Sequence, residues 1–446
     1  MRVTGEDAPH IVTLPPGPQS LTWLVRGTRA AAPMGRARQA DVRGGVARDV
    51  PPDSIVYATA KGANVTDVDG NRYVDFAAGF GAMLIGHGHP TILRVLELQS
   101  ARLLQALGDV FPSDAKVALL ERLVALYPEP GARAIIGQSG SDAVTAALKT
   151  AALASGRPGV LAFHGAYHGL SYAPLAACGL REGYRAPFSD QLNAHVTFLD
   201  YPRDEPSAAE VLERADVALR AGEIGAVLVE PILGRGGVIV PPSGFLAALA
   251  RVAKERGAVF VADEIWTGLG RSGAMLRSFD DGVVPDVVCL GKGLGGGLPA
   301  SACVGSASVM ASWRRDDEVV DTSTFAGAPL ACAAAIATLD VIRRERLVER
   351  SAELGGAFVG QLRDALRDVP LVTDVRGTGF MVGIDFGARP GAASRAQRNF
   401  LRRGYIVSTG GGRREVVVLT PPLTIAKPLL EGFVAIVAEA CREVGE

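Results

Sequence analysis

The feature that most constrains the fold of this chain is a series of five short apolar runs between residues 133 and 290. Amphipathic helical patterns separate the runs, for example Phe245 to Arg256. Continuous apolar runs of this length are typical of strands buried on both faces of a parallel sheet. The sequence therefore predicts an α/β fold. The runs are Arg133–Ile136, Gly159–Phe163, Ala226–Val229, Ala258–Ala262 and Val287–Leu290.

A polar or glycine-rich segment follows each of these runs. Ligands of open α/β sheets bind just beyond the carboxyl ends of the strands. Because the carboxyl ends of parallel strands meet at one edge, the five segments are predicted to converge on a single crevice. They are Gly137–Ser141, Tyr167–His168, Glu230, Asp263 and Lys292.

The 446 residues exceed what one hydrophobic core usually holds, so a large and a small domain are expected. Residues 62–75 alternate polar and apolar types around Asp69-Gly70-Asn71, which indicates a β-hairpin. A long helix is predicted from Arg343 to Arg367. The expected division is a loose N-terminal arm (1–50) with one short helix around Leu21 to Ala31, the first part of a small domain (51–75), a large ligand-binding domain (76–340) and the α+β remainder of the small domain (341–446).

Composition excludes several classes of function. The formal net charge is −1 and no basic stripe is present, so nucleic acid is not an expected partner. No signal-peptide pattern and no uninterrupted apolar stretch of membrane length is visible, so a cytoplasmic protein is expected. The five cysteines lack metal-ligand spacing and are expected to be buried free thiols, without a metal site.

Lys292 lies between two glycines in the glycine-rich segment Leu290–Pro299. A lysine that is sterically open and poorly solvated suits an amine that must form a covalent bond and also move protons. The alternative is a phosphate-binding loop with a supporting lysine, but the spacing GxxxxGK[ST] is absent.

Asp263 follows the fourth run directly. A carboxylate at that place can keep a pyridine nitrogen protonated, which makes the ring an electron sink. The alternative is an ordinary helix-capping Asp. The position of Lys292 after the next run favours the first interpretation.

Two further segments offer ligand contacts. Ser139-Gly140-Ser141 joins a run to the predicted helix Ala143 to Ala154, where backbone N–H groups and the helix dipole favour a phosphate. Tyr167 offers a flat surface to an aromatic ring. A plain N-cap and a packing tyrosine are the respective alternatives.

Together and in this order, these segments resemble class III (ornithine/GABA/ω-amino acid type) pyridoxal-phosphate (PLP) aminotransferases, from about Val56 to the C-terminus. The landmarks are Asp67–Asp75, Gly86–Pro90, Ser139–Ala143, Tyr167–Gly169, Glu230–Pro231, Asp263–Arg271, Gly291–Gly293, Thr322–Gly327 and Arg376–Gly377.

The resemblance implies a fold type I PLP transferase, with a mostly parallel seven-stranded-type sheet in the large domain and a smaller α+β domain. It implies that Lys292 forms the Schiff base with PLP and that Asp263 pairs with the pyridine nitrogen. It also implies a homodimer in which Thr324 reaches the phosphate of the neighbouring subunit. The cofactor-binding residues expected from it are Ser139, Gly140, Ser141, Tyr167, His168, Glu230, Asp263, Ile265, Lys292 and Thr324, with Tyr167 and Ile265 on the two ring faces.

Three residues are expected to contact substrate. Arg376 resembles the arginine that binds a substrate carboxylate, although a structural ion pair in the small domain is the alternative. Trp266 stands where the family usually has a glutamine that touches the ring hydroxyl, and its indole N–H can donate instead. Arg235 stands where related enzymes carry a glutamate; it either enlarges an anion site or pairs with an acid such as Glu230.

The expected function is transfer of an amino group from an amine or amino acid donor to a keto acid or other carbonyl acceptor, by a ping-pong mechanism. Racemisation, epimerisation or aminomutation on the same scaffold is the alternative. A catalytically silent binding protein is a third possibility, which the presence of both Lys292 and Asp263 opposes. Donors from ω-amino acids and diamines to α-amino acids, amino sugars and secondary-metabolite precursors remain open.

Overall fold

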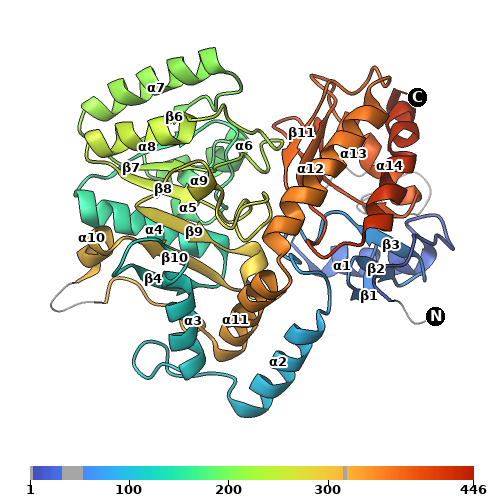
Figure 1. The fold of residues 1–446 in the computed structure, drawn as a ribbon, viewed down its shortest axis with the longest axis horizontal. Helices are drawn as coiled ribbons and strands as arrows, with labels where there is room; N and C mark the ends of the chain where they lie inside the picture. Colours follow the sequence, from blue (N-terminus) through green and yellow to red (C-terminus); the bar gives the residue numbers. More distant parts are fainter. Residues whose placement is uncertain (1–3, 33–53, 315–318, 446) are drawn as a thin grey trace.

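The computed structural model describes residues 4–32, 54–314 and 319–445. Figure 1 shows two lobes joined side by side. The larger lobe contains a seven-stranded sheet, and the second lobe contains two four-stranded sheets. Residues 1–3 and 33–50 of the predicted arm lie outside the described residues.

The seven-stranded sheet has the order β4-β10-β9-β8-β7-β5-β6. Four of its pairings are parallel and the two made by β10 are antiparallel, so the sheet is mainly parallel, as predicted. All five predicted runs are strands. The strands are β4 (Arg133–Gly137), β5 (Gly159–Phe163), β6 (Val196–Leu199), β7 (Ile224–Val229), β8 (Val259–Asp263), β9 (Val287–Leu290) and β10 (Ser301–Gly305).

Strand β4 joins the sheet through β10 and not through another of the predicted runs. Both neighbours of β10 run antiparallel to it, so β4 points the same way as β9 without bonding to another predicted run. The sequence prediction also omitted β6 and β10. β10 reads Ser-Ala-Cys-Val-Gly, whose small residues carry little strand signal.

Helices cover both faces of this sheet because successive strand residues point to opposite sides. Leu161, Val227 and Phe260 pack with helices α7 and α8, whereas Val160, Leu228 and Val261 pack with α4. The helices of the larger lobe are α2 (Pro90–Arg102), α3 (Asp114–Val124), α4 (Gly140–Ser155), α5 (Tyr172–Ala176), α6 (Glu182–Arg185), α7 (Glu205–Arg220), α8 (Phe245–Glu255), α9 (Arg277–Asp280), α10 (Ala307–Met310) and α11 (Pro329–Arg344).

The second lobe combines segments from both ends of the chain. The predicted hairpin is present as β2 and β3, and Tyr405 of β13 pairs in parallel with Val74. The other sheet is antiparallel, in the order β11-β12-β15-β14. The elements are β1 (Tyr57–Lys61), β2 (Asn64–Asp67), β3 (Arg72–Asp75), β11 (Asp374–Thr378), β12 (Met381–Asp385), β13 (Tyr405–Ile406), β14 (Ser408–Gly410), β15 (Val416–Leu419), α1 (Pro18–Ala30), α12 (Leu347–Leu366), α13 (Ala392–Arg402) and α14 (Lys427–Arg442).

The long helix predicted from Arg343 to Arg367 is present as α12, but it begins at Leu347, because Arg343 and Arg344 belong to α11 instead. The two helices are separated at Glu345 and Arg346, where Arg346 has φ +51°. Helix α11 packs against α2 and α3 of the larger lobe, whereas α12 packs against α14 and β11. The break therefore follows from packing against two different lobes, for which the local sequence has no glycine or proline signal.

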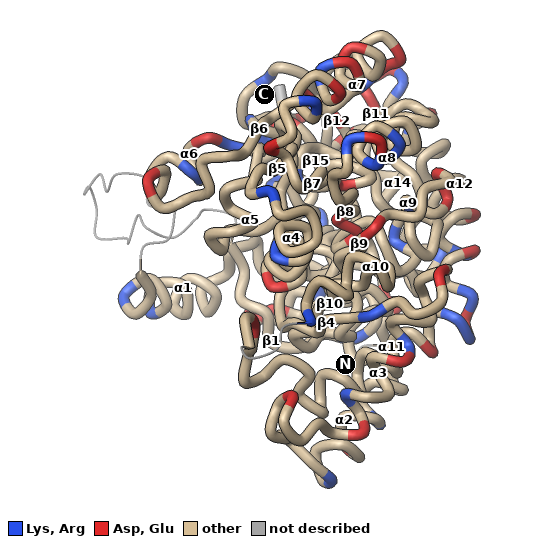
Figure 2. Tube along the Cα trace, turned by 90° about the vertical axis from the view of Figure 1, so that its left-hand side faces the viewer, with Lys and Arg blue, Asp and Glu red and all other residues tan. Residues whose placement is uncertain are grey.

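The described part of the N-terminal arm is bound to the second lobe rather than loose. His10 pairs with Arg72, and Asn71 accepts hydrogen bonds from the backbone of Val12 and Thr13. The predicted short helix is present as α1, which projects from the body of the molecule in Figure 2.

Charged residues of both signs are interspersed along outer helices such as α7 and α8 (Figure 2). Within residues 4–32, 54–314 and 319–445, no helix is both long and apolar enough to cross a bilayer. The same segments contain no cluster of three or more His, Cys, Asp or Glu side chains suited to a metal ion. All five cysteines are buried free thiols, as predicted.

Candidate active site

Four of the predicted polar segments meet at the carboxyl edge of the large sheet. Strands β8 and β9 are parallel neighbours, and Asp263 at the end of β8 lies opposite Cys289. Lys292 follows two residues after β9 ends. Glu230 follows β7, and Tyr167 and His168 follow β5 after a short loop. The parallel register therefore brings these residues to one crevice.

Asp263 is a buried carboxylate held in one orientation. Only 3% of it is exposed, and its Oδ2 lies 2.7 Å from Nδ1 of His168. Its Oδ1 accepts a hydrogen bond from the backbone N–H of Ile265 at 3.1 Å. Nε2 of His168 has no hydrogen-bond partner among the described residues. A fixed, desolvated charge of this kind stabilises a cation strongly because water does not screen it.

Lys292 has a strained backbone and a perturbed amine. Its φ is +39°, which costs a non-glycine residue on the order of 1 kcal/mol and is typical of functional sites. Burial lowers the pKa of Lys292 to about 8, although the charges of Asp263 and Glu230 partly oppose this effect. Its Nζ lies 4.6 Å from the ring centroid of Trp266.

Trp266 occupies a slot that two glycines open. A Cβ at Gly81 would lie 2.5 Å from the indole Nε1, and a Cβ at Gly234 would overlap the other side of the ring. Trp266 is 6% exposed, and its Nε1 has no partner within the described chain. Sequence analysis missed Gly81 and Gly234, because their role depends on a contact that spacing alone does not reveal.

The amino end of α4 forms a candidate phosphate cup. Ser139 is the N-cap, and the N–H groups of Gly140 and Ser141 have no carbonyl of their own helix to bond. A Cβ at Gly140 would lie 2.9 Å from Ile265 Cδ1, and a Cβ at Gly169 would overlap the Ser141 hydroxyl. The glycines thus let the backbone come close to both side chains. Ile265 also lies next to Gly291, between the cup and Lys292.

Glu230 organises the loops around the crevice. Its Oε1 accepts a hydrogen bond from the N–H of Tyr167 at 2.7 Å, and its Oε2 accepts one from Gly234 at 3.0 Å. Burial raises the pKa of Glu230 to about 7; the charge of His168 lowers this pKa and that of Asp263 raises it. Glu230 therefore fixes Tyr167 in place and makes no ion pair with Arg235 among the described residues.

Arg376 is already saturated with local partners. Its Nη1 and Nη2 lie 2.9 Å from Asp374 and 2.8 Å from Asp385. Its Nε and Nη2 also donate to the carbonyl oxygens of Gly237 and Val238. These contacts favour the structural ion pair, the alternative to the substrate-binding role suggested by resemblance.

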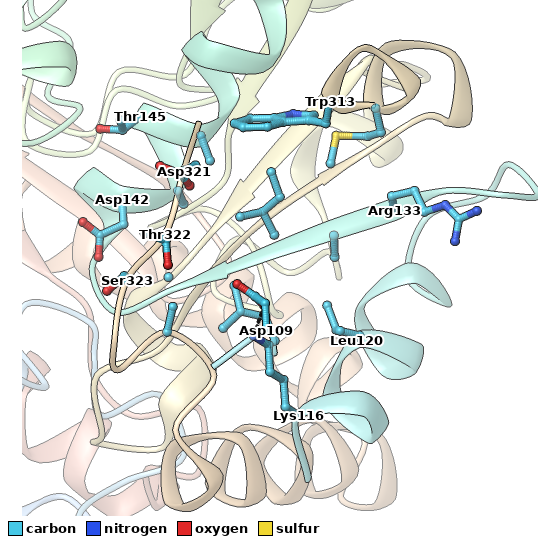
Figure 3. Close-up of a pocket in the computed structure, with 18 of the residues that line it drawn as sticks. Asp109, Lys116, Leu120, Arg133, Asp142, Thr145, Trp313, Asp321, Thr322 and Ser323 are labelled. Atoms are coloured by element: carbon cyan, nitrogen blue, oxygen red, sulfur yellow. Dashed lines mark hydrogen bonds and ion pairs between the residues drawn. The ribbon is translucent and has the colours of Figure 1, made fainter. Parts of the chain in front are cut away.

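Thr324 lies on the surface of the chain. Its carbonyl oxygen accepts a hydrogen bond from Gln105, and the hydroxyl of its neighbour Ser323 accepts one from Gln138. Figure 3 shows Ser323 close to Asp142 at the start of α4, beside a cavity of about 1030 Å³. Neither Lys292 nor Asp263 lines this cavity, whereas Gln138 and Asp142, on either side of the Ser139–Ser141 cup, do.

The crevice fits PLP in three respects. The α4 terminus has free N–H groups for a phosphate, Asp263 is a buried carboxylate suited to a ring nitrogen, and Lys292 is an amine of lowered pKa. In addition, two buried nitrogens, Nε2 of His168 and Nε1 of Trp266, have no partner among the described residues. Buried polar groups are normally bonded, so these atoms point to a missing ligand.

Comparison with known proteins agrees with this fit. The sequence profile of "Aminotransferase class-III" matches residues 46–441. The acetylornithine aminotransferase of Mycobacterium tuberculosis is 37% identical over 390 residues, which cover 86% of this chain and 90% of that protein. The 4-aminobutyrate aminotransferase of the same organism is 33% identical over 446 residues, covering 94% and 95%.

Solved structures give the same result. An amine transaminase from an uncultivated Pseudomonas species, in its PLP-bound form, aligns with a TM-score of 0.83 at 29% identity, covering 92% of this chain and all of that one (100%). An (S)-enantioselective ω-transaminase from Thermomicrobium roseum aligns with a TM-score of 0.82 at 28% identity, covering 88% and 94%. The chain belongs to the class-III aminotransferases and is a PLP-dependent enzyme that transfers amino groups between amino and keto substrates.

Proposed function

We propose that Lys292 and Asp263 are the catalytic residues of this aminotransferase, and that the reaction proceeds by a ping-pong mechanism. When bound, PLP supplies an aldehyde that condenses with amines and a ring that withdraws electrons from the adjacent carbon. Lys292 holds the cofactor covalently between turnovers, and its freed Nζ then moves the proton at the substrate carbon. Asp263, oriented by His168, keeps the ring nitrogen protonated. The buried Asp263 carboxylate on the strand next to Lys292 carries this proposal.

The other proposed contacts surround these two residues. Ser139, Gly140 and Ser141 bind the phosphate through the helix terminus. Ile265 and Tyr167 pack on the two ring faces, Trp266 donates its indole N–H to the cofactor, and Glu230 holds the Tyr167 loop.

Incubation of the holoenzyme with an amino donor alone tests the ping-pong proposal. With stoichiometric amino donor and no acceptor, one equivalent of carbonyl product and one of pyridoxamine phosphate per subunit are expected, and a keto acid added afterwards should consume the latter. Inversion of the donor carbon without pyridoxamine phosphate would instead indicate a racemase or epimerase.

The lowered pKa of Lys292 predicts the pH dependence of cofactor capture. Only a neutral amine attacks an aldehyde, so the rate of covalent PLP uptake by the apoprotein should rise up to about pH 8 and then level off. A lysine with the ordinary pKa of 10.5 would show a rate that still rises at pH 10. Stopped-flow absorbance across this range distinguishes the two outcomes.

Trp266→Phe should weaken the binding of PLP while the slot remains filled. The substitution keeps an aromatic ring and removes only the N–H, whose hydrogen bond is worth about 0.5–1.5 kcal/mol, or roughly two- to tenfold in affinity. Equilibrium dialysis of PLP against the apoprotein measures this change. Trp313→Phe is a matched control, because Trp313 donates to Thr150 outside the crevice. Equal affinities of the Trp266 variant and the wild type would exclude the proposed contact.

We propose a homodimer in which Thr324 completes the neighbouring phosphate site. Residues 103–111 expose Leu104, Leu107, Val110 and Phe111, the last of which is 68% exposed. Gln105 links this apolar surface to Thr324, and a surface of this kind is typical of an interface. Sedimentation equilibrium should give twice the chain mass of 46.4 kDa, whereas a monomer would contradict the proposal.

We also propose a cytoplasmic location, which the five buried thiols support because the cytoplasm is reducing. The parallel pairing of β3 with β13 supports a small domain built from residues 51–75 and 341–446, next to a large domain of residues 76–340.

A further inference from the structure

A pocket of about 250 Å³ adjoins the crevice on the side of the second lobe. Its lining comes from the loop around Phe80, from the start of α6, from the loop that carries Arg235 and from residues 406–414. Three arginines line it, Arg181, Arg235 and Arg414, and none of the residues that line it is acidic. Arg181 and Arg235 thus bring positive charge to walls that contain no acidic residue, and such a pocket attracts an anion.

The backbone of Arg235 is held in place, whereas its guanidinium has no acidic partner among the described residues. Its carbonyl oxygen accepts a hydrogen bond from Gly411 at 2.8 Å. The carbonyl oxygens of Gly237 and Val238, two and three residues further on, accept from Arg376. Its guanidinium lies 4.6 Å from the ring centroid of Tyr167 and has no ion-pair partner in the described parts of the chain.

Arg181 also lacks hydrogen-bond partners for part of its guanidinium. Its Nε is buried and has no partner among the described residues, and its Nη2 makes only a 3.3 Å contact with the carbonyl oxygen of Gly411. Leaving a buried charged donor unpaired costs free energy, so a ligand that accepts a hydrogen bond from it gains that stabilisation. Gly411 thus bonds to two of the three arginines that line the pocket, Arg181 and Arg235.

Two contacts link the pocket to the residues around Lys292. Tyr167, on which Arg235 stacks, is a predicted cofactor-ring contact, and Gly81, next to Phe80, is in contact with Trp266. The positive charge of Arg235 also lowers the pKa of Lys292, as a smaller effect than burial. A substrate held beside Lys292 would therefore extend toward these guanidinium groups.

We propose that this pocket binds the carboxylate of the amino donor and of the keto acid, through Arg235 and Arg181 rather than through Arg376. The proposal rests on the aminotransferase function and assigns the substrate class of the same site. Two planar guanidinium groups suit a carboxylate because each can donate a forked pair of hydrogen bonds. Arg376 instead supports the site from behind, by holding the loop that carries Arg235.

Glutarate, a dicarboxylate that has no group able to react, provides a test that does not depend on turnover. Isothermal titration of the holoenzyme should show binding, with a dissociation constant that rises roughly ten- to a hundredfold in Arg235→Gln and in Arg181→Gln. Arg185→Gln is the matched control. Its guanidinium stacks on Phe198 outside the pocket, so it removes the same charge from the same region and should leave the affinity unchanged.

A matched pair of donors tests the pocket during the reaction. The ratio of kcat/KM for 4-aminobutyrate to that for butylamine should fall roughly tenfold or more in Arg235→Gln, mainly through KM, and recover in part in Arg235→Lys. No binding of glutarate to the wild type, or equal ratios in all variants, overturns the proposal and leaves amino transfer intact. Glutarate binding that depends on Arg235 without amino transfer from any donor would support the pocket and contradict the proposed function.

Discussion

Lys292→Ala should abolish amino transfer, lowering kcat by on the order of 10⁴-fold. The substitution removes both the amine that holds the cofactor and the base that moves the proton. The backbone at this position has φ +39°, which alanine adopts as readily as lysine does, so the fold should persist. Turnover with an amino donor and 2-oxoglutarate or pyruvate measures the loss.

Lys254→Ala is the control for this prediction. Lys254 lies near the end of α8 on the exposed surface, so its loss should leave activity within about twofold. If the Lys292 variant retained more than a tenth of the wild-type rate, another group would have to hold the cofactor and the assignment would be wrong.

Asp263→Asn should reduce kcat by on the order of 10²–10³-fold. The amide keeps the shape of the carboxylate and still contacts His168, but it carries no charge to keep a ring nitrogen protonated. The variant should therefore lose rate while it folds normally and retains the covalent bond at Lys292. Rates of the two half-reactions, together with the melting temperature, separate a chemical effect from a structural one.

Asp200→Asn is the matched exchange for this experiment. The side chain of Asp200 is 73% exposed and lies 3.7 Å from Arg214, so no rate change is expected. Wild-type kinetics in the Asp263 variant would show that the carboxylate only orients His168 or caps the loop that follows β8.

Much of the site could be predicted from the sequence because it depends on strand ends. Buried strands can be identified from their apolar composition. Parallel pairing of two such strands then brings Asp263 and Lys292 to neighbouring positions. The same reasoning failed for β10, because its small residues are also typical of loops and because it runs antiparallel to its neighbours. It also failed at Arg346, where packing against two lobes ends a helix that the local sequence would continue.

Substrate contacts were harder to predict because they depend on which charges are already neutralised. The sequence indicates Arg376 and Arg235 as candidate substrate contacts. Only the fold shows that Arg376 is paired with Asp374 and Asp385, while Arg235 stacks on Tyr167. Arg181 had no local signal at all. It faces the pocket only because residues 406–414 of the second lobe approach the larger lobe.

Borohydride reduction of the holoprotein, followed by proteolysis and mass spectrometry, tests the central claim most directly. Reduction makes permanent the bond between the cofactor and the amine that holds it. We expect the pyridoxyl mass on the peptide that contains Lys292 and on no other lysine. An unlabelled Lys292, or a label on a different lysine, would contradict the account.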